Sequence, residues 1–206
     1  MTKRKLISLI IIFIATAFLK PESSLHQQEY AFVTKVIDGD TIKMLKNNTV
    51  RYIGINAPES NEYLYEESKQ FNKKMVEKKK VLLKFDIKKY DHYNRILAYV
   101  YTMDSKFVNA ELIRNGYAYF YPHPFETLLF NELLNAQRYA ISNNLGIFKK
   151  LLIETSSYYI GNKNSLRFHR PNCEGAAKMS KKNKLYFKNK KEAYWNGYAP
   201  CKKCNP

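Results

Sequence analysis

The acidic and basic residues of one stretch, Val36–Glu59, could together bind a divalent cation and a phosphate. Two acids, Asp38 and Asp40, precede a short apolar segment, and Glu59 follows a second one. Carboxylate oxygens are the ligands that Ca²⁺ prefers. The guanidinium of Arg51, which lies between the acids in the sequence, matches the oxygens of a phosphate. This combination indicates chemistry on a phosphate ester.

Two predicted strands must bring these groups together. The segments Thr41–Lys46 and Thr49–Ile55 are expected as strands, and Lys46–Thr49 is typical of a tight turn. Their apolar positions are Ile42, Met44, Val50, Tyr52, Ile53 and Ile55. A hairpin returns the chain to the place where it began. We therefore expect Asp40 to lie beside the segment Asn56–Glu59.

The stretch resembles the thermonuclease (staphylococcal nuclease) family in its order of Asp-Gly-Asp-Thr, an arginine and then Asn-Ala-Pro-Glu. A second block, Asp91–Tyr101, is similar to the Asp-x-Tyr-Gly-Arg-x-Leu-Ala-Tyr segment of that family. The resemblance covers about residues 30–150. The chain departs from the family at Asn56, Ala57 and Asn94, where Asp, Thr and Gly are usual.

The resemblance implies a calcium-dependent endonuclease that hydrolyses DNA and RNA and leaves 3′-phosphates. Arg51 and Arg95 would hold the scissile phosphate and offset its developing charge. Glu59 would orient or deprotonate the attacking water. Three oxygen donors are the implied calcium ligands: Asp40, Asn56 and the backbone carbonyl of Ala57.

Aromatic residues accompany these motifs. Tyr93, Tyr119 and Tyr121 are candidates to stack on bases or to line the substrate cleft. Half-buried tyrosines on strands are the structural alternative. His92 and His123 have no partner that the sequence reveals, so we expect them at the surface.

The wider pattern predicts an α+β fold, namely a five-stranded OB-type β-barrel with three helices and a small C-terminal metal-binding module. Strands are expected in the hairpin and at three other segments, Tyr30–Ile37, Val81–Asp86 and Arg95–Thr102. Helices are expected at Asn61–Lys80, Val108–Asn115 and Phe125–Asn143. In the last helix a core-facing stripe has spacings of four, three and four residues: Leu129, Leu133, Ala136 and Ala140.

The C-terminal segment, residues 156–206, has a different character. From Ile160 to Pro206 it holds 12 lysines and arginines against two glutamates, a net charge of +10. Four nitrogen and sulfur ligands with the spacing of a tetrahedral zinc site occur there: His169, Cys173, Cys201 and Cys204. The segment resembles the metal-binding domain of the Ada DNA-repair protein, with a histidine in place of one cysteine. A Cys201–Cys204 disulfide or free thiols are the alternatives.

The N-terminal residues 1–17 have the pattern of an export signal. Basic residues Lys3-Arg4-Lys5 precede the apolar run Leu6–Leu19, and Ala15-Thr16-Ala17 is suited to cleavage. The run is shorter than the roughly 20 residues of a spanning helix, although a retained anchor remains an alternative. We expect a secreted protein or one held at the outer face of the membrane, with membrane contact only through this segment.

The charge of the whole chain favours an anionic partner. The 206 residues carry a formal net charge of +17 and an isoelectric point near 9.6. This charge and the motifs together predict a protein that acts on DNA and RNA. We expect a monomer that needs no small-molecule cofactor. Two other function classes are open. One is a catalytically inactive nucleic-acid-binding OB-fold protein, and the other is a cationic surface adhesin. The joint presence of Arg51, Glu59 and Arg95 argues against the first.

Overall fold

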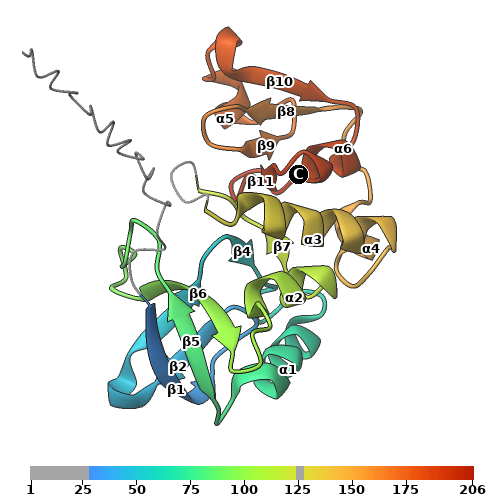
Figure 1. Cartoon of the computed structure of the whole chain (residues 1–206). Helices are drawn as coiled ribbons and strands as arrows, with labels where there is room; N and C mark the ends of the chain where they lie inside the picture. The colour runs from blue at the N-terminus through green and yellow to red at the C-terminus, as the bar shows by residue number, and fades with distance from the viewer. Residues whose placement is uncertain (1–27, 124–127) are drawn as a thin grey trace, which may run out of the picture.

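The structure, a computed structural model, describes residues 28–123 and 128–206 (Figure 1). Five of its strands form a closed barrel in the order β1-β2-β3-β6-β5. They are β1 (Gln28–Val36), β2 (Thr41–Met44), β3 (Thr49–Tyr52), β5 (Lys80–Lys84) and β6 (Ile96–Thr102). β3 and β6 run parallel, and the other neighbours run antiparallel. The predicted five-stranded OB-type barrel is therefore confirmed.

The barrel is held by side chains that alternate along its strands. Inward-facing aliphatic residues from all of these strands are completely buried, among them Val33, Ile42, Val50, Val81 and Val100. Burial of each such side chain contributes about 1.5–3 kcal/mol. The predicted tight turn at Lys46–Thr49 is instead a short 3₁₀ helix, η1 (Leu45–Asn47), which ends where Asn47 adopts a left-handed conformation with φ of 60°.

The third predicted strand, Thr49–Ile55, is wrong as a single element. Gly54 has φ of +74°, and the chain turns there so that β4 (Ile55–Asn56) leaves the barrel and pairs with β7 (Tyr119–Phe120). A β-carbon at Gly54 would lie 2.6 Å from Leu133 Cδ1. The turn carries the segment that follows β4 out to the end of the barrel.

Helix α1 (Tyr65–Val76) is shorter than the predicted Asn61–Lys80. Glu77 is extended and Lys78 has φ of 58°, so the chain turns directly into β5. α2 (Val108–Arg114) agrees with its prediction within one residue. In α3 (Phe130–Ser142) the predicted core stripe is confirmed, with Leu133, Ala136 and Ala140 buried and Leu129 partly buried.

Two sequence predictions lie outside the described residues in whole or in part. They are the export signal at 1–17 and the start of the predicted helix at Phe125. Within residues 28–123 and 128–206, no helix is both long and apolar enough to cross a membrane.

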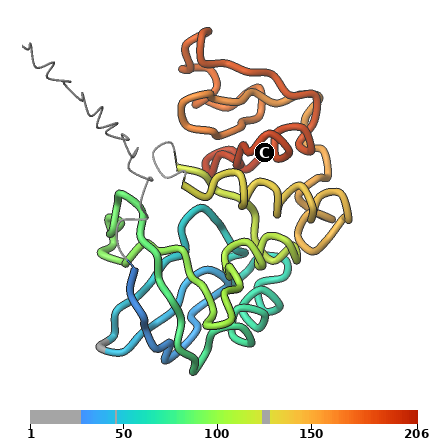
Figure 2. The backbone as a smooth tube through the Cα atoms, in the orientation of Figure 1, coloured from blue at the N-terminus to red at the C-terminus, as the bar shows by residue number. Residues whose placement is uncertain are grey.

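The C-terminal segment forms a four-stranded sheet in the order β10-β8-β9-β11. Its elements are β8 (Tyr159–Asn162), β9 (Arg167–His169), α5 (Glu174–Ala177), β10 (Lys184–Phe187), α6 (Lys190–Trp195) and β11 (Ala199–Pro200). Figure 1 and Figure 2 show α3 between this sheet and the barrel.

The sheet shares a hydrophobic core with the helices beneath it. Ile141 of α3 and Phe148 of α4 (Phe148–Leu151) belong to one buried cluster with Phe168 and Tyr194. Gln137, which is completely buried, accepts a hydrogen bond from the Phe120 N–H (2.8 Å) and donates one to the Tyr194 carbonyl (2.6 Å). The C-terminal segment is thus packed onto the barrel through α3, and its stability rests partly on this shared core.

Candidate active site and metal centre

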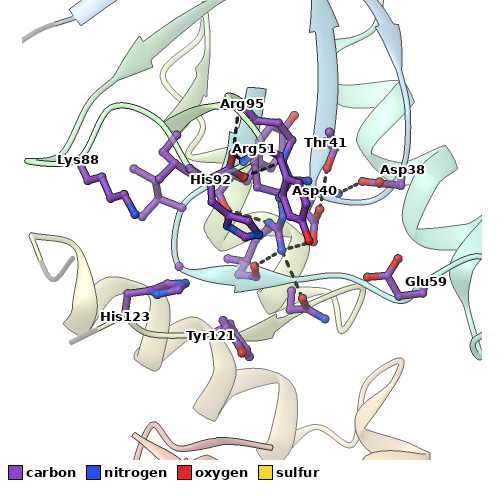
Figure 3. A pocket seen from close by; sticks show the side chains of 18 of the residues that line it. Asp38, Asp40, Thr41, Arg51, Glu59, Lys88, His92, Arg95, Tyr121 and His123 are labelled. Carbon is purple, nitrogen blue, oxygen red and sulfur yellow. Dashed lines mark hydrogen bonds and ion pairs between the residues drawn. The ribbon is translucent and has the colours of Figure 1, made fainter. Parts of the chain in front are cut away.

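A cleft of about 580 Å³ opens at the end of the barrel where the β2–β3 hairpin, the loop before β6 and the end of β7 meet (Figure 3). Five residues singled out from the sequence line it: Asp40, Arg51, Asn56, Glu59 and Arg95. The predicted approach of Asp40 to the Asn56–Glu59 segment is confirmed by a hydrogen bond from the Ala57 N–H to Asp40 Oδ2 (2.7 Å).

Arg51 is held rigidly at the centre of the cleft. Its Nη1 donates to the Tyr52 carbonyl and its Nη2 to the Ile55 carbonyl, each at 2.9 Å. Nη2 also lies 2.9 Å from Asp40 Oδ2. Because backbone carbonyls hold the guanidinium in place, its direction is set by the turn at Gly54 before any substrate binds.

Asp40 is a buried acid with several partners. Oδ1 accepts a hydrogen bond from the Thr41 hydroxyl (3.0 Å), and the Asp40 N–H donates to Asp38 Oδ1 (2.9 Å). Burial raises the pKa of Asp40 to about 6; the Arg51 charge opposes this rise and the Asp38 charge adds to it. A bound cation would offset this cost, because it favours the ionised form of a carboxylate.

The oxygen donors around Asp40 are of the kind that calcium binds. Asp38, Asp40 and Glu59 all line the cleft, and in Figure 3 Asp38 and Glu59 lie on the same side of Arg51. Carboxylate oxygens gathered in this way fit a hard cation. Asp40, together with these two acids and the Asn56 amide, would hold it.

The amide of Asn56 connects the hairpin to β7. Its Oδ1 accepts from Arg51 Nη2 (3.3 Å), and its Nδ2 donates to the Ala57 carbonyl (3.2 Å) and to the Tyr119 hydroxyl (3.1 Å). Asn56 lines the cleft, but its amide oxygen, the atom predicted to bind calcium, already accepts from Arg51. Ala57, the third predicted ligand, is not among the residues that line the cleft, and its carbonyl already accepts the Asn56 amide.

Arg95 is oriented by a carboxylate from its own loop. Asp91 Oδ2 accepts from Arg95 Nε (2.7 Å), and Asp91 Oδ1 accepts from the N–H groups of Tyr93 and Arg95 (2.9 Å each). Burial alone would raise the pKa of Asp91. The hydrogen bonds from Arg95 and from the Tyr93 N–H, together with the charge of Arg95, outweigh the effect of burial and hold the pKa below its ordinary value. Asn94 has φ of 60°, which explains how it replaces the glycine usual in the family.

Glu59 lies on an exposed loop at the edge of the cleft. Its backbone N–H donates to the Glu62 carboxylate (2.9 Å), and its carbonyl accepts from the Glu62 N–H (2.8 Å). These two bonds shape the loop. They place Glu59 on the same side of Arg51 as Asp38, as Figure 3 shows.

The three predicted tyrosines separate into two groups. Tyr93, which is 70% exposed, and Tyr121 both line the cleft. Tyr119 does not line it. Its hydroxyl accepts from Asn56, and its ring contacts Tyr194 edge-on with centroids 6.0 Å apart. Its position matches the alternative considered for these residues, a half-buried strand tyrosine.

Several cleft residues were not predicted from the sequence. His92, His123 and Lys88 line the cleft, and in Figure 3 Lys88 and His123 lie on the side of Arg51 opposite Asp38. Loss of water contact lowers the pKa of His123, and the charges of Arg167, Arg51, Lys88 and Lys202 lower it further. Both histidines are exposed, as the sequence predicted, but their place in the cleft was not predicted. Their positions next to Tyr93 and Tyr121 were the available signal.

A buried polar residue of α1 supports the acids from behind. Asn72, completely buried, donates to the Asp38 carbonyl (3.0 Å) and accepts from the Tyr52 hydroxyl (2.9 Å). Gly39 packs against the same helix so closely that a β-carbon would lie 1.9 Å from Ser68 Oγ. Polar residues on a helix gave no sign of this role in the sequence, because surface helices carry many of them.

The four predicted zinc ligands come together in the C-terminal sheet. The ligand atoms of His169, Cys173, Cys201 and Cys204 all lie within 4.8 Å of one another, and His169 Nδ1 is 3.4 Å from Cys173 Sγ. Zinc–sulfur bonds of about 2.3 Å in a tetrahedron place ligand atoms roughly 3.8 Å apart. All three cysteines are free thiols, so the alternative of a Cys201–Cys204 disulfide is not present.

The chemistry of this cluster also suits a metal. Although burial opposes them, hydrogen bonds from Cys204 and from the backbone N–H groups of Gly175 and Ala176 lower the pKa of the Cys173 thiol. Burial raises the pKa of the Cys204 thiol to about 12. The thiolate is the form that binds zinc. The soft donor set and its compactness therefore fit a closed structural zinc site, with the four residues as ligands.

Comparison with known proteins agrees with this geometry. Residues 49–150 match the family of staphylococcal nuclease homologues, and residues 154–206 match the metal binding domain of Ada. The thermonuclease of Staphylococcus intermedius is 33% identical over 144 residues, which are 65% of this chain and 83% of that protein.

Two further relatives come from other lineages. Endonuclease YncB of Bacillus subtilis is 34% identical over 140 residues, which are 62% of this chain and 66% of that protein. An uncharacterised protein of Methanocaldococcus jannaschii is 32% identical over 153 residues, which are 60% of this chain and 73% of that protein. The chain belongs to the staphylococcal nuclease family and carries a C-terminal segment similar to the metal-binding domain of Ada.

Proposed function

We propose that the protein is a calcium-dependent endonuclease that hydrolyses phosphodiester bonds of DNA and RNA and leaves 3′-phosphates. The observation that supports this most strongly is the single cleft in which Arg51 and Arg95 face the acids Asp40 and Glu59. Two guanidinium groups match the charge of a phosphodiester, and acids beside them match a cation and a water molecule.

The arginines would hold the phosphate and stabilise the charge that develops on it. Arg51 is fixed by the carbonyls of Tyr52 and Ile55, and Arg95 by Asp91, so neither needs to reorganise during the reaction. Arg51 comes from β3 and Arg95 from the loop before β6, and both line the cleft in which the phosphate would lie.

Glu59 would orient the attacking water or accept its proton. Attack at phosphorus breaks the bond to the 5′-oxygen, which leaves as a hydroxyl after taking up a proton, and the phosphate remains on the 3′-side. Calcium, when bound, supplies positive charge that polarises a phosphate oxygen. Asp40 and the neighbouring acids would hold it.

Digestion of plasmid DNA and of RNA with Ca²⁺, with Mg²⁺ or with a chelator tests the proposal, together with end-group analysis of the products. We expect cleavage of both substrates with Ca²⁺, none with the chelator, and 3′-phosphate ends. Binding without cleavage under all three conditions would instead identify a catalytically inactive nucleic-acid-binding protein. Products with 5′-phosphates would contradict the proposed direction of bond breakage.

We also propose that the protein acts outside the cytoplasm, either secreted or anchored at the outer face of the membrane. The support is the basic and apolar pattern of residues 1–17. N-terminal sequencing of the protein recovered from medium and from membranes tests this. A new N-terminus just after Ala17 is expected for cleavage, whereas an intact Met1 in membranes would indicate an anchor.

A further inference from the structure

The turn between the last two cysteines of the chain reaches into the cleft of the nuclease barrel. Lys202, which lies between Cys201 and Cys204, lines the same cleft as Arg51 and Arg95. Its Nζ lies 5.6 Å from the centroid of the Tyr121 ring. A residue of the C-terminal sheet therefore takes part in a site that otherwise belongs to the barrel.

A second cation of the C-terminal sheet contacts the same tyrosine. The guanidinium carbon of Arg167 lies 3.7 Å from the centre of the Tyr121 ring, and Arg167 Nη1 donates to the Pro122 carbonyl (2.9 Å). β11, which leads into the cysteine turn, pairs with β9, which begins at Arg167. The two contacts and this pairing fix the C-terminal sheet against the segment after β7.

The cysteine turn itself is held firmly. The Cys201 N–H donates to the Phe168 carbonyl and the Asn205 N–H to the Cys201 carbonyl, each at 2.9 Å. Cys201 and Cys204 flank Lys202 and are two of the four clustered ligands. The side chain of Lys202 thus extends from a backbone that is anchored on both sides.

The charge of Lys202 is available to a ligand. Lys202 is exposed, and among the residues that the structure describes no carboxylate lies within ion-pair distance of it. It lines the cleft together with Lys88, which in Figure 3 lies on the side of Arg51 away from the acids. This side of the cleft is therefore positive, as the backbone of a polynucleotide requires.

We infer that Lys202 binds a phosphate of the polynucleotide next to the scissile one, so that the cysteine turn of the metal-binding segment forms part of the substrate site of the nuclease. The inference rests on the proposed function in that the ligand is nucleic acid, but it concerns binding and does not require cleavage. The turn supplies a fixed point charge, and Tyr121, which Arg167 contacts, lies beside it.

The test measures binding of a fluorescein-labelled 12-residue oligothymidylate to the full chain at several salt concentrations. Glu59→Gln is present in every protein so that the oligonucleotide stays intact. Lys202→Ala is compared with Lys203→Ala, which removes the same charge from the same turn at a residue that does not line the cleft. Lys202→Met is added because it keeps an apolar stem over Tyr121 while removing the charge.

We expect Lys202→Ala and Lys202→Met to weaken binding by about 10-fold and to reduce the slope of log K against log salt by about 0.7, as the loss of one phosphate contact on a single strand predicts. Lys203→Ala should change both quantities much less. Equal effects of Lys202→Ala and Lys203→Ala, or no effect of either, would overturn the inference. Normal binding by Lys202→Met would show that packing on Tyr121 and not charge is responsible.

The binding test of Lys202 can fail or succeed independently of the cleavage test of the proposed nuclease activity. Cleavage is measured on proteins that retain Glu59, whereas binding is measured without it. A chain that binds through Lys202 and never cleaves would refute the proposed activity alone. A chain that cleaves with calcium but binds equally well without Lys202 would refute the inference alone.

Discussion

The cleft of the barrel and the Cys/His cluster are both candidate ion sites, but they are built by opposite means. In the cleft, charged groups are held by the protein itself: Arg51 by two backbone carbonyls and Arg95 by Asp91. In the cluster, the ligand atoms of three thiols and an imidazole lie within 4.8 Å of one another, and backbone N–H groups are further partners of Cys173. The charged groups of the cleft are therefore oriented by the protein alone, whereas we expect the cluster to require a bound metal to join its ligands.

This difference predicts that the two metals have different uses. Loss of calcium should remove chemistry and leave the fold intact, because the hairpin and its hydrogen bonds remain. Loss of zinc should affect the fold, because the cluster connects β9, α5 and the end of β11. Tyr194 and Gln137 connect the C-terminal sheet to α3 and β7, so loss of zinc should also destabilise the packing of these two elements.

The largest expected effect is that of removing zinc. The full chain should contain close to one zinc ion by elemental analysis, and Cys173→Ser or a zinc chelator should lower the melting temperature by about 10 °C or more. Chelation of calcium alone, with a ligand that spares zinc, should change it little. Absence of metal in the purified full chain, together with an unchanged melting temperature in Cys173→Ser, would contradict the zinc site.

The next effect concerns the arginines of the cleft. Arg51→Lys and Arg95→Lys keep the charge but lose the planar fork, and Glu59→Gln loses the base. Each should reduce kcat/KM by about 100-fold or more, because each removes an interaction made in the transition state. Arg114→Lys, on the exposed end of α2, is the matched control and should cleave normally. Near wild-type rates in all three cleft variants would disprove the assigned roles.

A smaller effect is expected at Asn56, where the family usually has an aspartate. A carboxylate there would add a negative charge beside Asp40, which should stabilise bound calcium by about 1–3 kcal/mol and tighten binding about 10- to 100-fold. The calcium concentration for half-maximal cleavage by Asn56→Asp should therefore be lower than that of the wild type. An unchanged or higher concentration would show that Asn56 is not a ligand, or that Asp38 already supplies the charge.

The smallest effect concerns the pH dependence of stability through Asp91. Because its pKa is lowered in the folded chain, Asp91 stabilises the fold above its unfolded pKa of about 3.8, and this contribution is lost as the pH falls through the folded value. Asp91→Asn should therefore lower the free energy of unfolding by about 1–2 kcal/mol at pH 7. Urea unfolding of both proteins from pH 7 to pH 3 should show the difference shrinking only below pH 4. A difference that stays constant over this range would mean that the Asp91 carboxylate is not ionised in its pair with Arg95.

The sequence by itself determined the features that depend on neighbours in the chain. Apolar positions and a turn predicted that Asp40 would meet the segment after the second strand, because a strand pair returns the chain to its start whatever surrounds it. The spacing of His169 to Cys173 and of Cys201 to Cys204 indicated a metal cluster for the same reason, since each pair lies within one turn. Five strands with a helix between the third and fourth were enough to predict the barrel.

Tertiary structure alone decided which side chains share a surface across long separations in the sequence. The predicted third strand ends at Gly54 because the backbone turns there with a positive φ. Leu133 also leaves no room for a side chain at this position. Tyr119 packs on Tyr194 outside the cleft, while Lys202 enters it beside Tyr121. These positions follow from how α3 packs between the barrel and the C-terminal sheet. That packing is the sum of many small contacts, none of which leaves a recognisable pattern in the chain.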